Sequence, residues 1–241
     1  MATKAELKNI DNLVRFYLQK DSQELVSIVM KQVLVALRDS VPLVQHVHSF
    51  KYRLKSAEHL RGKLVRKQDE AKARGLPLDI TVQNLFVKIG DLVGIRILHL
   101  HTREFEQIDH ALRAIFKERK YRLAEKPFAR TWDDEYRGYF RGLGIKVQSS
   151  PTMYTSVHYS IEPVSRTKIR CEIQVRTLME EVWGEVDHGF NYPRPTSSVA
   201  CREQIKALAR ATSSATRLVD SIFATVADIH SKSHRGRTRK K

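Results

Sequence analysis

The sequence contains very little cysteine. Two of its 241 residues are cysteines, Cys171 and Cys201, and neither belongs to a Cys-x-x-Cys pair. Two such residues cannot build a disulfide framework, and by themselves they cannot complete a zinc site. We therefore expect both thiols to be free and buried, in a protein of a reducing compartment.

Long apolar stretches are also missing. The first residues, MATKAELKNID, include no apolar segment after the first lysine, so we expect no secretory signal peptide. The nearest approach to a membrane span, Leu25–Leu37, is interrupted by Lys31 and Gln32 and is shorter than the roughly 20 residues that a span needs. These absences predict a soluble, cytoplasmic protein that does not associate with a membrane.

Acidic residues are scarce relative to basic ones. The chain has 43 Lys and Arg against 27 Asp and Glu, which gives a formal net charge of +16. A field of this size attracts polyanions such as nucleotides and nucleic acids. The last ten residues, Lys232–Lys241, contain six cations and no acid, which predicts a disordered basic tail over 231–241.

Hydrophobic periodicity predicts a mixed α+β protein with helical extensions. Apolar residues recur at helical spacing through 1–45, so we expect an amino-terminal helical extension there. Strands are predicted at Val93–Leu98, Ser156–Ile161 and Lys168–Val175, and helices at Glu104–Lys117, Leu178–His188 and Arg202–Ile229. Strands mixed with helices indicate a mixed β-sheet with flanking helices over 46–193, followed by a carboxy-terminal helix within 194–230.

Two segments have weaker patterns. The basic stretch His46–Arg74 contains a further helix, which the sequence Arg74-Gly-Leu-Pro77 ends. The stretch Ala124–Pro151 is polar, rich in aromatic residues and arginine, and poorly periodic. We expect it to form a long functional loop with little regular structure.

The segment Arg53–Arg66 places several cations along one side of a predicted helix. At about 100° per residue, the positions nearest to Lys55 are His59, Lys63 and Arg66, whereas the opposite side is apolar. Lys55 and Lys63 are about 12 Å apart along such a helix, roughly the reach of a triphosphate. The pattern indicates a phosphate-binding face, and a solvated basic surface is the alternative on spacing alone.

Polar side chains mark two of the predicted strands. Asp91 immediately precedes the strand at Val93, where a carboxylate can bind Mg²⁺ together with substrate phosphates. In the strand at Lys168–Val175 and just after it, Glu172, Gln174 and Arg176 alternate with apolar residues and therefore share one face. Such a row is costly if buried without partners, so it favours a polar cleft. A turn aspartate and an exposed sheet face are the alternatives.

Aromatic and histidine residues accompany these strands. Tyr154 precedes the Ser156-x-His158 sequence, and an aromatic ring at this place can stack on a base, with packing against the strand as the alternative. His158 can face the same cleft as the polar row. On the helix Leu178–His188, His188 lies on the polar side with Glu181, and we expect the core to receive Leu178, Val182 and Val186.

Taken together and in this order, the motifs resemble the RelA/SpoT-type (p)ppGpp synthetase domain. They are RxKxxxxxxxK from Arg53, DLVGIR from Asp91, YTSVHY from Tyr154, EIQVRT from Glu172 and WGEVDH from Trp183. The resemblance runs from about His46 to Pro193, and the pairing of EIQVRT with an upstream DLVGIR is highly specific. It implies a nucleotidyltransferase-like fold. It also implies Mg²⁺-dependent transfer of the β,γ-diphosphate of ATP to the 3′-hydroxyl of GDP or GTP, with release of AMP.

The resemblance also implies roles for individual residues. Asp91 and Glu172 would be the catalytic pair and would handle the metal and the acceptor hydroxyl. The implied ATP-binding residues are Arg53, Lys55, His59, Lys63, Arg66 and Arg96. The implied acceptor-binding residues are Tyr154, Ser156, His158, Gln174, Arg176 and His188, with Tyr154 stacked on the acceptor base. With no upstream hydrolase motif, the chain looks like a stand-alone small alarmone synthetase, whose relatives form homo-oligomers.

Departures from the family pattern leave the acceptor open. His59 stands where the family usually has serine, and Met153 stands where it usually has the glycine before the stacking tyrosine. A bulky residue at that place stiffens the loop and alters acceptor choice. A toxin-like enzyme that modifies the 3′ end of tRNA is the first alternative, favoured by the charge of +16 and the basic tail. A non-catalytic RNA-binding module is the second, and retention of Asp91 and Glu172 speaks against it.

Overall fold

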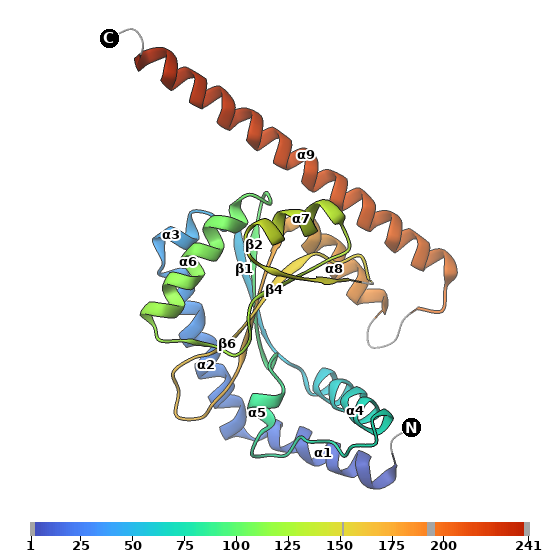
Figure 1. Cartoon of the computed structure of the whole chain (residues 1–241). Coiled ribbons are helices and arrows are strands. Elements are labelled where there is room, and N and C mark those ends of the chain that lie inside the picture. Colours follow the sequence, from blue (N-terminus) through green and yellow to red (C-terminus); the bar gives the residue numbers. More distant parts are fainter. Residues whose placement is uncertain (1–2, 151, 192–195, 239–241) are drawn as a thin grey trace.

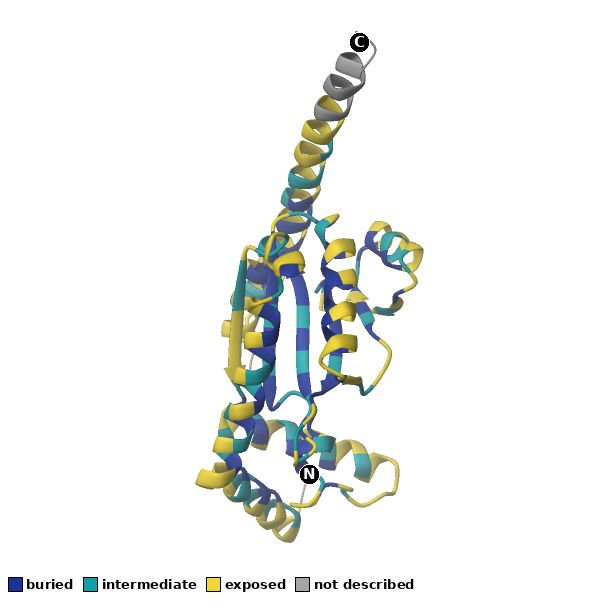
Figure 2. Ribbon diagram, turned by 90° about the vertical axis from the view of Figure 1, so that its left-hand side faces the viewer, coloured by how far each residue is buried: buried dark blue, intermediate teal, exposed yellow. Residues whose placement is uncertain are grey.

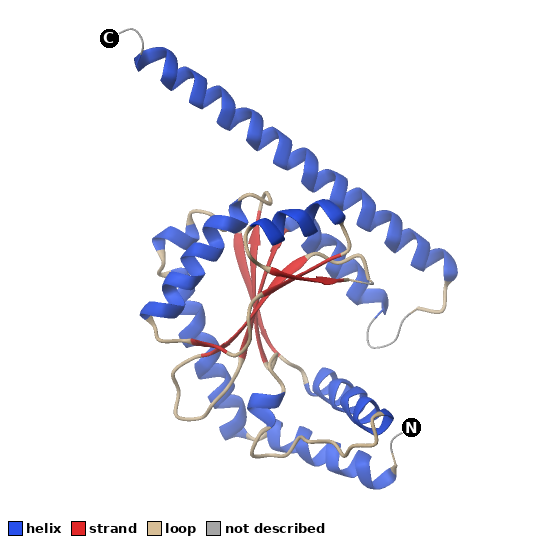
Figure 3. Ribbon diagram, viewed as in Figure 1, coloured by secondary structure: helices blue, strands red, loops and turns tan. Residues whose placement is uncertain are grey.

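A mixed β-sheet runs through the middle of the molecule and carries helices on both faces (Figures 1 and 3). The computed structural model describes residues 3–150, 152–191 and 196–238, with side chains up to residue 229. The helices are α1 (Lys4–Leu18), α2 (Lys20–Arg38), α3 (Val41–Val44), α4 (Ala57–Ala73), α5 (Leu85–Lys88), α6 (Glu104–Glu118), α7 (Asp134–Gly142), α8 (Leu178–Asn191) and α9 (Val199–Thr238).

The strands are β1 (Ser49–Leu54), β2 (Val93–His99), β3 (Arg122–Leu123), β4 (Phe128–Thr131), β5 (Lys146–Ser149), β6 (Ser156–Glu162) and β7 (Cys171–Thr177). Their order in the sheet is β1-β2-β7-β6-β4-β5, and β3 pairs with β6. Pairs β2–β7 and β4–β5 are parallel and the others are antiparallel. The predicted α+β class with a mixed sheet is therefore confirmed.

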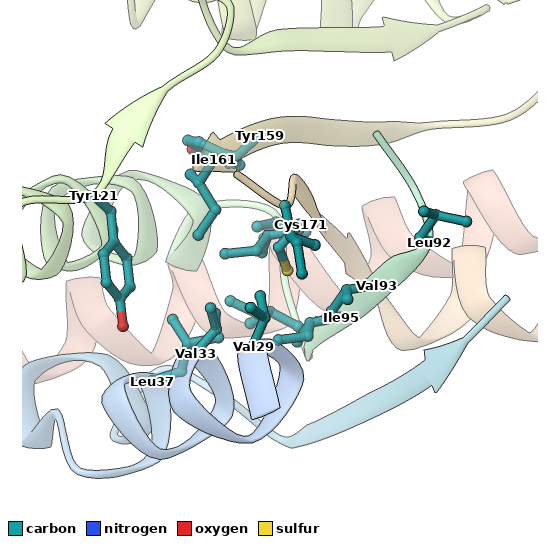
Figure 4. Packing of buried hydrophobic residues seen from close by; sticks show 14 of the residues in the cluster. Val29, Val33, Leu37, Leu92, Val93, Ile95, Tyr121, Tyr159, Ile161 and Cys171 are labelled. Atoms are coloured by element: carbon teal, nitrogen blue, oxygen red, sulfur yellow. The ribbon is translucent and has the colours of Figure 1, made fainter. Parts of the chain in front are cut away.

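The core lies between the sheet and the helices on one of its faces. Figure 4 shows Val29, Val33 and Leu37 of α2 packed toward Ile95 of β2 and Cys171 of β7, which are all buried. The same cluster includes Ile10, Leu13 and Tyr17 of α1. Burying a side chain of this size contributes about 1.5–3 kcal/mol, so the amino-terminal helices help to hold the sheet rigid.

Two segments are more regular than the sequence analysis predicts. Strand β1 (Ser49–Leu54) lies in the basic stretch, and its apolar residues alternate with basic ones over only six positions. The segment expected to be a long loop contains β4, α7 and β5. Both strands have four residues, too few to show a period, and β4 is stabilised by pairing with the distant strand β6. The correction matters because β4 extends the functional face of the sheet.

Helix α9 crosses the outside of α7 and α8 and then continues away from the sheet (Figure 1). The first half of α9 is held to the rest of the domain by hydrogen bonds. The Trp183 indole N–H donates to the Ile205 carbonyl at 3.0 Å, and the Thr102 N–H donates to Asp220 at 2.6 Å. Phe223 stacks on His101 with ring centroids 4.2 Å apart. Beyond Phe223, residues 224–229 are mostly exposed (Figure 2).

The carboxy-terminal predictions fall partly outside the described residues. Helix α9 begins three residues before Arg202, and its backbone runs past Ile229 to Thr238. The side chains of the basic tail lie outside the described part of the chain, as do the predicted boundaries at 193 and 194. Among the described helices, none is both long and apolar enough to cross a membrane.

Candidate active site

Polar side chains form two rows across the face of the sheet opposite the core. Residues directly opposite one another on paired strands point to the same face. One row joins Arg53 of β1, Gly94 of β2 and Glu172 of β7. The next row runs from β1 to β4 and consists of Lys51, Arg96, Gln174, His158 and Phe128. The predicted polar face of β7 is thus confirmed and continues on both sides.

A cleft of about 230 Å³ lies over these rows. It is lined by Lys51, Tyr52, Arg53, Asp91, Gly94, Ile95, Arg96, Glu172, Gln174, Glu185 and His188. Six of the residues predicted from sequence therefore meet at one place: Arg53, Asp91, Arg96, Glu172, Gln174 and His188.

Asp91 lies between two lysines at one end of the cleft. The Lys55 and Lys63 ammonium groups each approach one of its carboxylate oxygens at 2.8 Å. Burial alone would raise the pKa of Asp91, but the two lysines outweigh it and lower the pKa, so the carboxylate stays ionised. Burial lowers the pKa of Lys55, and Asp91 partly opposes that shift.

The route by which Lys55 reaches Asp91 differs from the prediction. Lys55 is not on the helix, because Ser56 caps the amino end of α4 with its hydroxyl, which accepts from the His59 N–H at 3.2 Å. The Lys55 backbone carbonyl instead accepts from the Tyr17 hydroxyl of α1 at 2.7 Å. The β1–α4 junction thus presents Lys55, and the first turns of α4 present Lys63.

Glu172 is held by its neighbours in the two rows. One of its oxygens faces His158 Nδ1 at 3.1 Å, and the other accepts from the Gln174 amide at 2.9 Å. Burial would raise the pKa of Glu172, but the hydrogen bond and charge of His158 lower it, so this carboxylate is also ionised. His158 stacks nearly parallel on Phe128, with ring centroids 5.1 Å apart. Its Nε2 is buried and has no hydrogen-bond partner among the described atoms.

Helix α8 contributes acidic side chains to the cleft. Arg96 donates to Glu181 at 3.1 Å and to Glu185 at 2.6 Å, and Lys51 pairs with Glu181 at 2.7 Å. The predicted core face of α8 is wrong for Val182, which is 53% exposed, and Leu178 and Val186 are only partly buried. The buried side chains of this helix are instead Glu180, Glu181 and Trp183. The reason is that α8 lies between a polar cleft and α9, so its inward side must hold ion pairs.

Tyr154 and Arg176 form a second group beside the cleft. The Tyr154 hydroxyl donates to the Gln174 amide oxygen at 3.2 Å, and its ring lies 5.4 Å from the Arg176 guanidinium. Arg176 is buried and ion-paired with Glu181. Gly184 of α8 gives it room, since a Cβ there would lie 2.7 Å from Arg176 Nη1.

Eight of the predicted residues are not part of the cleft lining, among them Arg66, Ser156 and His59. Arg66 is 63% exposed in its side chain and pairs with Glu70 at 3.8 Å, because α4 carries it past the cleft. Ser156 is buried, and its hydroxyl donates to the Val175 carbonyl at 3.3 Å. His59 lies at the rim, where its ring meets that of His188 edge-on at 5.5 Å.

Sequence analysis missed several residues of the site. Lys51 and Glu185 line the cleft, Phe128 supports His158, and Gly184 makes room for Arg176. The alternation in SFKYRL could have revealed Lys51, and Glu185 follows Glu181 by one helical turn. Nothing local marks Phe128, because its role depends on strand pairing.

Asp91 and Glu172 are the best candidates for a metal site. The described residues contain no group of three or more His, Cys, Asp or Glu side chains that could hold a metal ion. Mg²⁺ needs no such cage, because it commonly uses one or two carboxylates together with substrate phosphates. The two ionised carboxylates are near enough that the charge of Asp91 affects the pKa of Glu172, so the donor set fits this ion.

Comparison with solved structures finds the same fold. A GTP pyrophosphokinase family protein from Streptococcus pneumoniae is 17% identical with a TM-score of 0.63, over 90% of this chain and 97% of that one. Small alarmone synthetase 1 from Bacillus subtilis bound to its product pppGpp is 17% identical with a TM-score of 0.56, over 88% and 97%. The same synthetase bound to AMPCPP is 15% identical with a TM-score of 0.55, over 89% and 98%.

The sequence itself places the chain in a family. Among curated proteins no similar sequence is found. Residues 52–197, more than half of the chain, match the family described as "Region found in RelA / SpoT proteins", and this range includes every motif described above. The chain therefore belongs to the RelA/SpoT family.

Proposed function

We propose that this protein is a GTP diphosphokinase-type transferase that makes (p)ppGpp from ATP and GDP or GTP. The observation that carries the proposal is the meeting of two ionised carboxylates with several cations in one cleft. Diphosphate transfer depends mainly on positioning and on stabilising charge, which is what such a site supplies. The Bacillus subtilis relatives carry pppGpp and AMPCPP, which agrees with nucleotide substrates.

ATP would occupy the end of the cleft formed by β1, β2 and α4. The Arg53 side chain lies over Gly94, and Arg96 follows two residues later on the same face, so two planar guanidinium groups line this end of the cleft. Adenine can stack between such planar cations. Lys55 and Lys63 would turn from Asp91 to the phosphates, where each ammonium group donates to phosphate oxygens.

The acceptor would lie over β7 and β6. Its 3′-hydroxyl would donate its proton to Glu172, which is ionised and held in place by His158 and Gln174. A new bond then forms between the 3′-oxygen and the β-phosphorus, and the bond between the α,β-bridging oxygen and that phosphorus breaks to release AMP. Tyr154 would stack on the base, and the unpaired Nε2 of His158 would contact the acceptor.

Mg²⁺ would be held by Asp91 and Glu172 together with ATP phosphates. Bound there, the ion would neutralise charge on the transferring group. Asp91 forms ion pairs with both Lys55 and Lys63, so positive charge beside this carboxylate is favourable.

A labelled-ATP assay tests the proposed function. ATP labelled at the γ-phosphate is incubated with Mg²⁺ and with GDP, GTP or tRNA, and the products are separated by thin-layer chromatography. We expect label on the guanine nucleotide and stoichiometric AMP. Formation of ADP alone would remove the pyrophosphokinase assignment, and labelling of tRNA without turnover of GDP or GTP would favour the toxin-like alternative.

A further inference from the structure

Met153, the residue before Tyr154, has an unusual backbone conformation. Its φ angle is 56°, in the left-handed region that favours glycine. Among the described residues other than glycine, only Lys120 shares this feature, also with a φ angle of 56°. A bulky side chain persists in this region only when its surroundings fix it there.

The residues that contact the Met153 side chain belong to helices α8 and α9. Its side chain packs against a small apolar cluster of Trp183 from α8 and Ile205 and Ala209 from α9. This cluster is separate from the main core, and Tyr154 packs on it as well. The indole hydrogen bond from Trp183 to the Ile205 carbonyl joins the two helices at the same place.

The two residues that follow Met153 are also held by hydrogen bonds. The Tyr154 N–H donates to the Ser150 hydroxyl at 3.3 Å, and the Thr155 N–H donates to Glu180 of α8 at 3.1 Å. The Tyr154 hydroxyl reaches Gln174, which in turn holds Glu172. The position of Tyr154 relative to the catalytic carboxylate thus depends on how residues 152–155 are fastened to α8 and α9.

We propose that Met153 is a positioning residue for the acceptor. Its side chain fastens the segment that carries Tyr154 to the α8–α9 cluster and thereby sets the tyrosine relative to Glu172. The ATP end of the cleft, built from β1, α4 and Asp91, has no residue in this cluster. The effect is therefore confined to the acceptor. This inference rests on the proposed function, which assigns Tyr154 to the acceptor.

Two measurements on Met153→Ala test the proposal. By hydrogen–deuterium exchange, the Tyr154 and Thr155 amides should exchange at least about fivefold faster, because local opening becomes easier, while β1 and α4 stay unchanged. In steady-state kinetics, the KM for GDP or GTP should rise at least about fivefold and the KM for ATP should stay within about twofold. Met153→Leu, which conserves volume, should restore both properties.

Control variants separate positioning from general damage. Lys120→Gly changes the other left-handed position, which is exposed, and should alter neither the exchange of residues 152–155 nor either KM. In a double-mutant cycle, Ile205→Ala from α9 should add little to Met153→Ala, because both weaken one cluster.

The outcomes also distinguish the two proposals. If the wild-type protein turns over neither GDP nor GTP, the proposed function fails, while amide exchange still tests the fastening. Unchanged exchange in Met153→Ala would overturn the inference. Faster exchange with an unchanged acceptor KM, in an enzyme that makes the guanine product, would overturn the positioning role.

Discussion

Charge at single residues dominates the chemistry of the cleft. Asp91 and Glu172 are both ionised, but for different reasons: Lys55 and Lys63 lower the pKa of Asp91, and His158 lowers the pKa of Glu172. The site therefore keeps two negative charges close together in a setting of excess positive charge. Such an arrangement of charges contributes little to the stability of the fold. Its charges become useful when phosphates and a cation bind in the cleft.

Removing either charge should nearly abolish turnover. Asp91→Asn and Glu172→Gln keep the shape of the side chains, so we expect folded proteins whose rate falls by roughly 10³-fold or more, about 4 kcal/mol. Asp79→Asn is the control, because Asp79 is exposed and pairs with Lys88 away from the cleft. More than a tenth of wild-type activity in either cleft variant would contradict the assignment.

Gly184 should be intolerant of a single added carbon. Alanine normally stabilises a helix interior relative to glycine by about 0.5–1 kcal/mol. Here its Cβ would lie 2.7 Å from Arg176 Nη1, and Arg176 is buried against Tyr154 and Glu181. We expect Gly184→Ala to shift Arg176 and lower kcat/KM for the acceptor by at least about tenfold, with little change in melting temperature.

Gly189→Ala is the matched control for that change. Gly189 lies on the same helix, and a Cβ there would meet nothing within 4 Å. It should leave the kinetics unchanged. Equal effects of the two substitutions would show that helix flexibility, and not room for Arg176, explains the glycine.

Glu180 should make stability depend on pH. Burial raises its pKa to about 7 from a usual 4.5, although the Thr155 N–H and Arg176 act in the opposite direction. Because the folded state binds the proton more tightly, the stability from this group is fully present below pH 4.5 and is lost as the pH rises through 7. A glutamine keeps the acceptor oxygen and cannot ionise.

We therefore expect Glu180→Gln to be more stable than the wild type at pH 8, on the order of 2 kcal/mol, and closer to it at pH 5. Urea denaturation at the two pH values measures the difference. Glu118→Gln, at an exposed position, should show no such dependence. An equal effect of Glu180→Gln at both pH values would mean that the folded protein keeps this carboxyl ionised at neutral pH.

At the scale of elements, the two halves of the cleft have different origins. Strand β1 and helix α4 supply Arg53 and Lys63 on the proposed ATP side, and the Tyr17 hydroxyl of α1 holds the junction between them through the Lys55 carbonyl. Strands β6 and β7 supply the proposed acceptor side, which α8 and α9 support. Substitutions in one half should therefore leave the Michaelis constant of the other substrate nearly unchanged.

Lys63→Ala and Arg53→Ala test this division. Each should raise the KM for ATP at least about tenfold, as expected when a charged contact worth roughly 1.5–3 kcal/mol is lost, and change the acceptor KM little. Arg66→Ala is the control, since Arg66 lies on the same helix but outside the cleft. A change confined to the acceptor KM would mean that the two nucleotide pockets are reversed.

Local pattern explains which parts of the fold could be predicted. Strand β7 was recognisable because period-2 alternation alone separates Glu172 and Gln174 from the apolar face. Strand β4 and the Phe128–His158 stack depend on pairing with a strand about 30 residues away in sequence, which no local pattern records. The inward face of α8 was mispredicted because apolar periodicity assumes an apolar neighbour, and its neighbour is a polar cleft.

At the scale of the whole molecule, the net charge of +16 exceeds what one nucleotide site needs. Ion pairs such as those of Lys51, Arg96 and Arg176 with Glu181 and Glu185 do not reduce this excess, because the net charge already counts the acids. The carboxy-terminal cations have no acid among them in the last ten residues. A mononucleotide in the cleft gives such a segment little to bind, whereas a long RNA offers many phosphates.

Truncation after Ser231 decides between the two kinds of acceptor. If GDP or GTP is the acceptor, as we propose, removing the six cations of Lys232–Lys241 should leave kcat/KM within about threefold, under about 0.7 kcal/mol. If tRNA is the acceptor, the truncation should weaken RNA binding and flatten its salt dependence. The reason is that fewer phosphate contacts release fewer counterions on binding. Both acceptors are to be measured with full-length and truncated protein at two salt concentrations. Efficient, tail-dependent labelling of tRNA beside negligible turnover of GDP and GTP would overturn the proposed acceptor, because no single nucleotide could make catalysis depend on a segment so rich in positive charge.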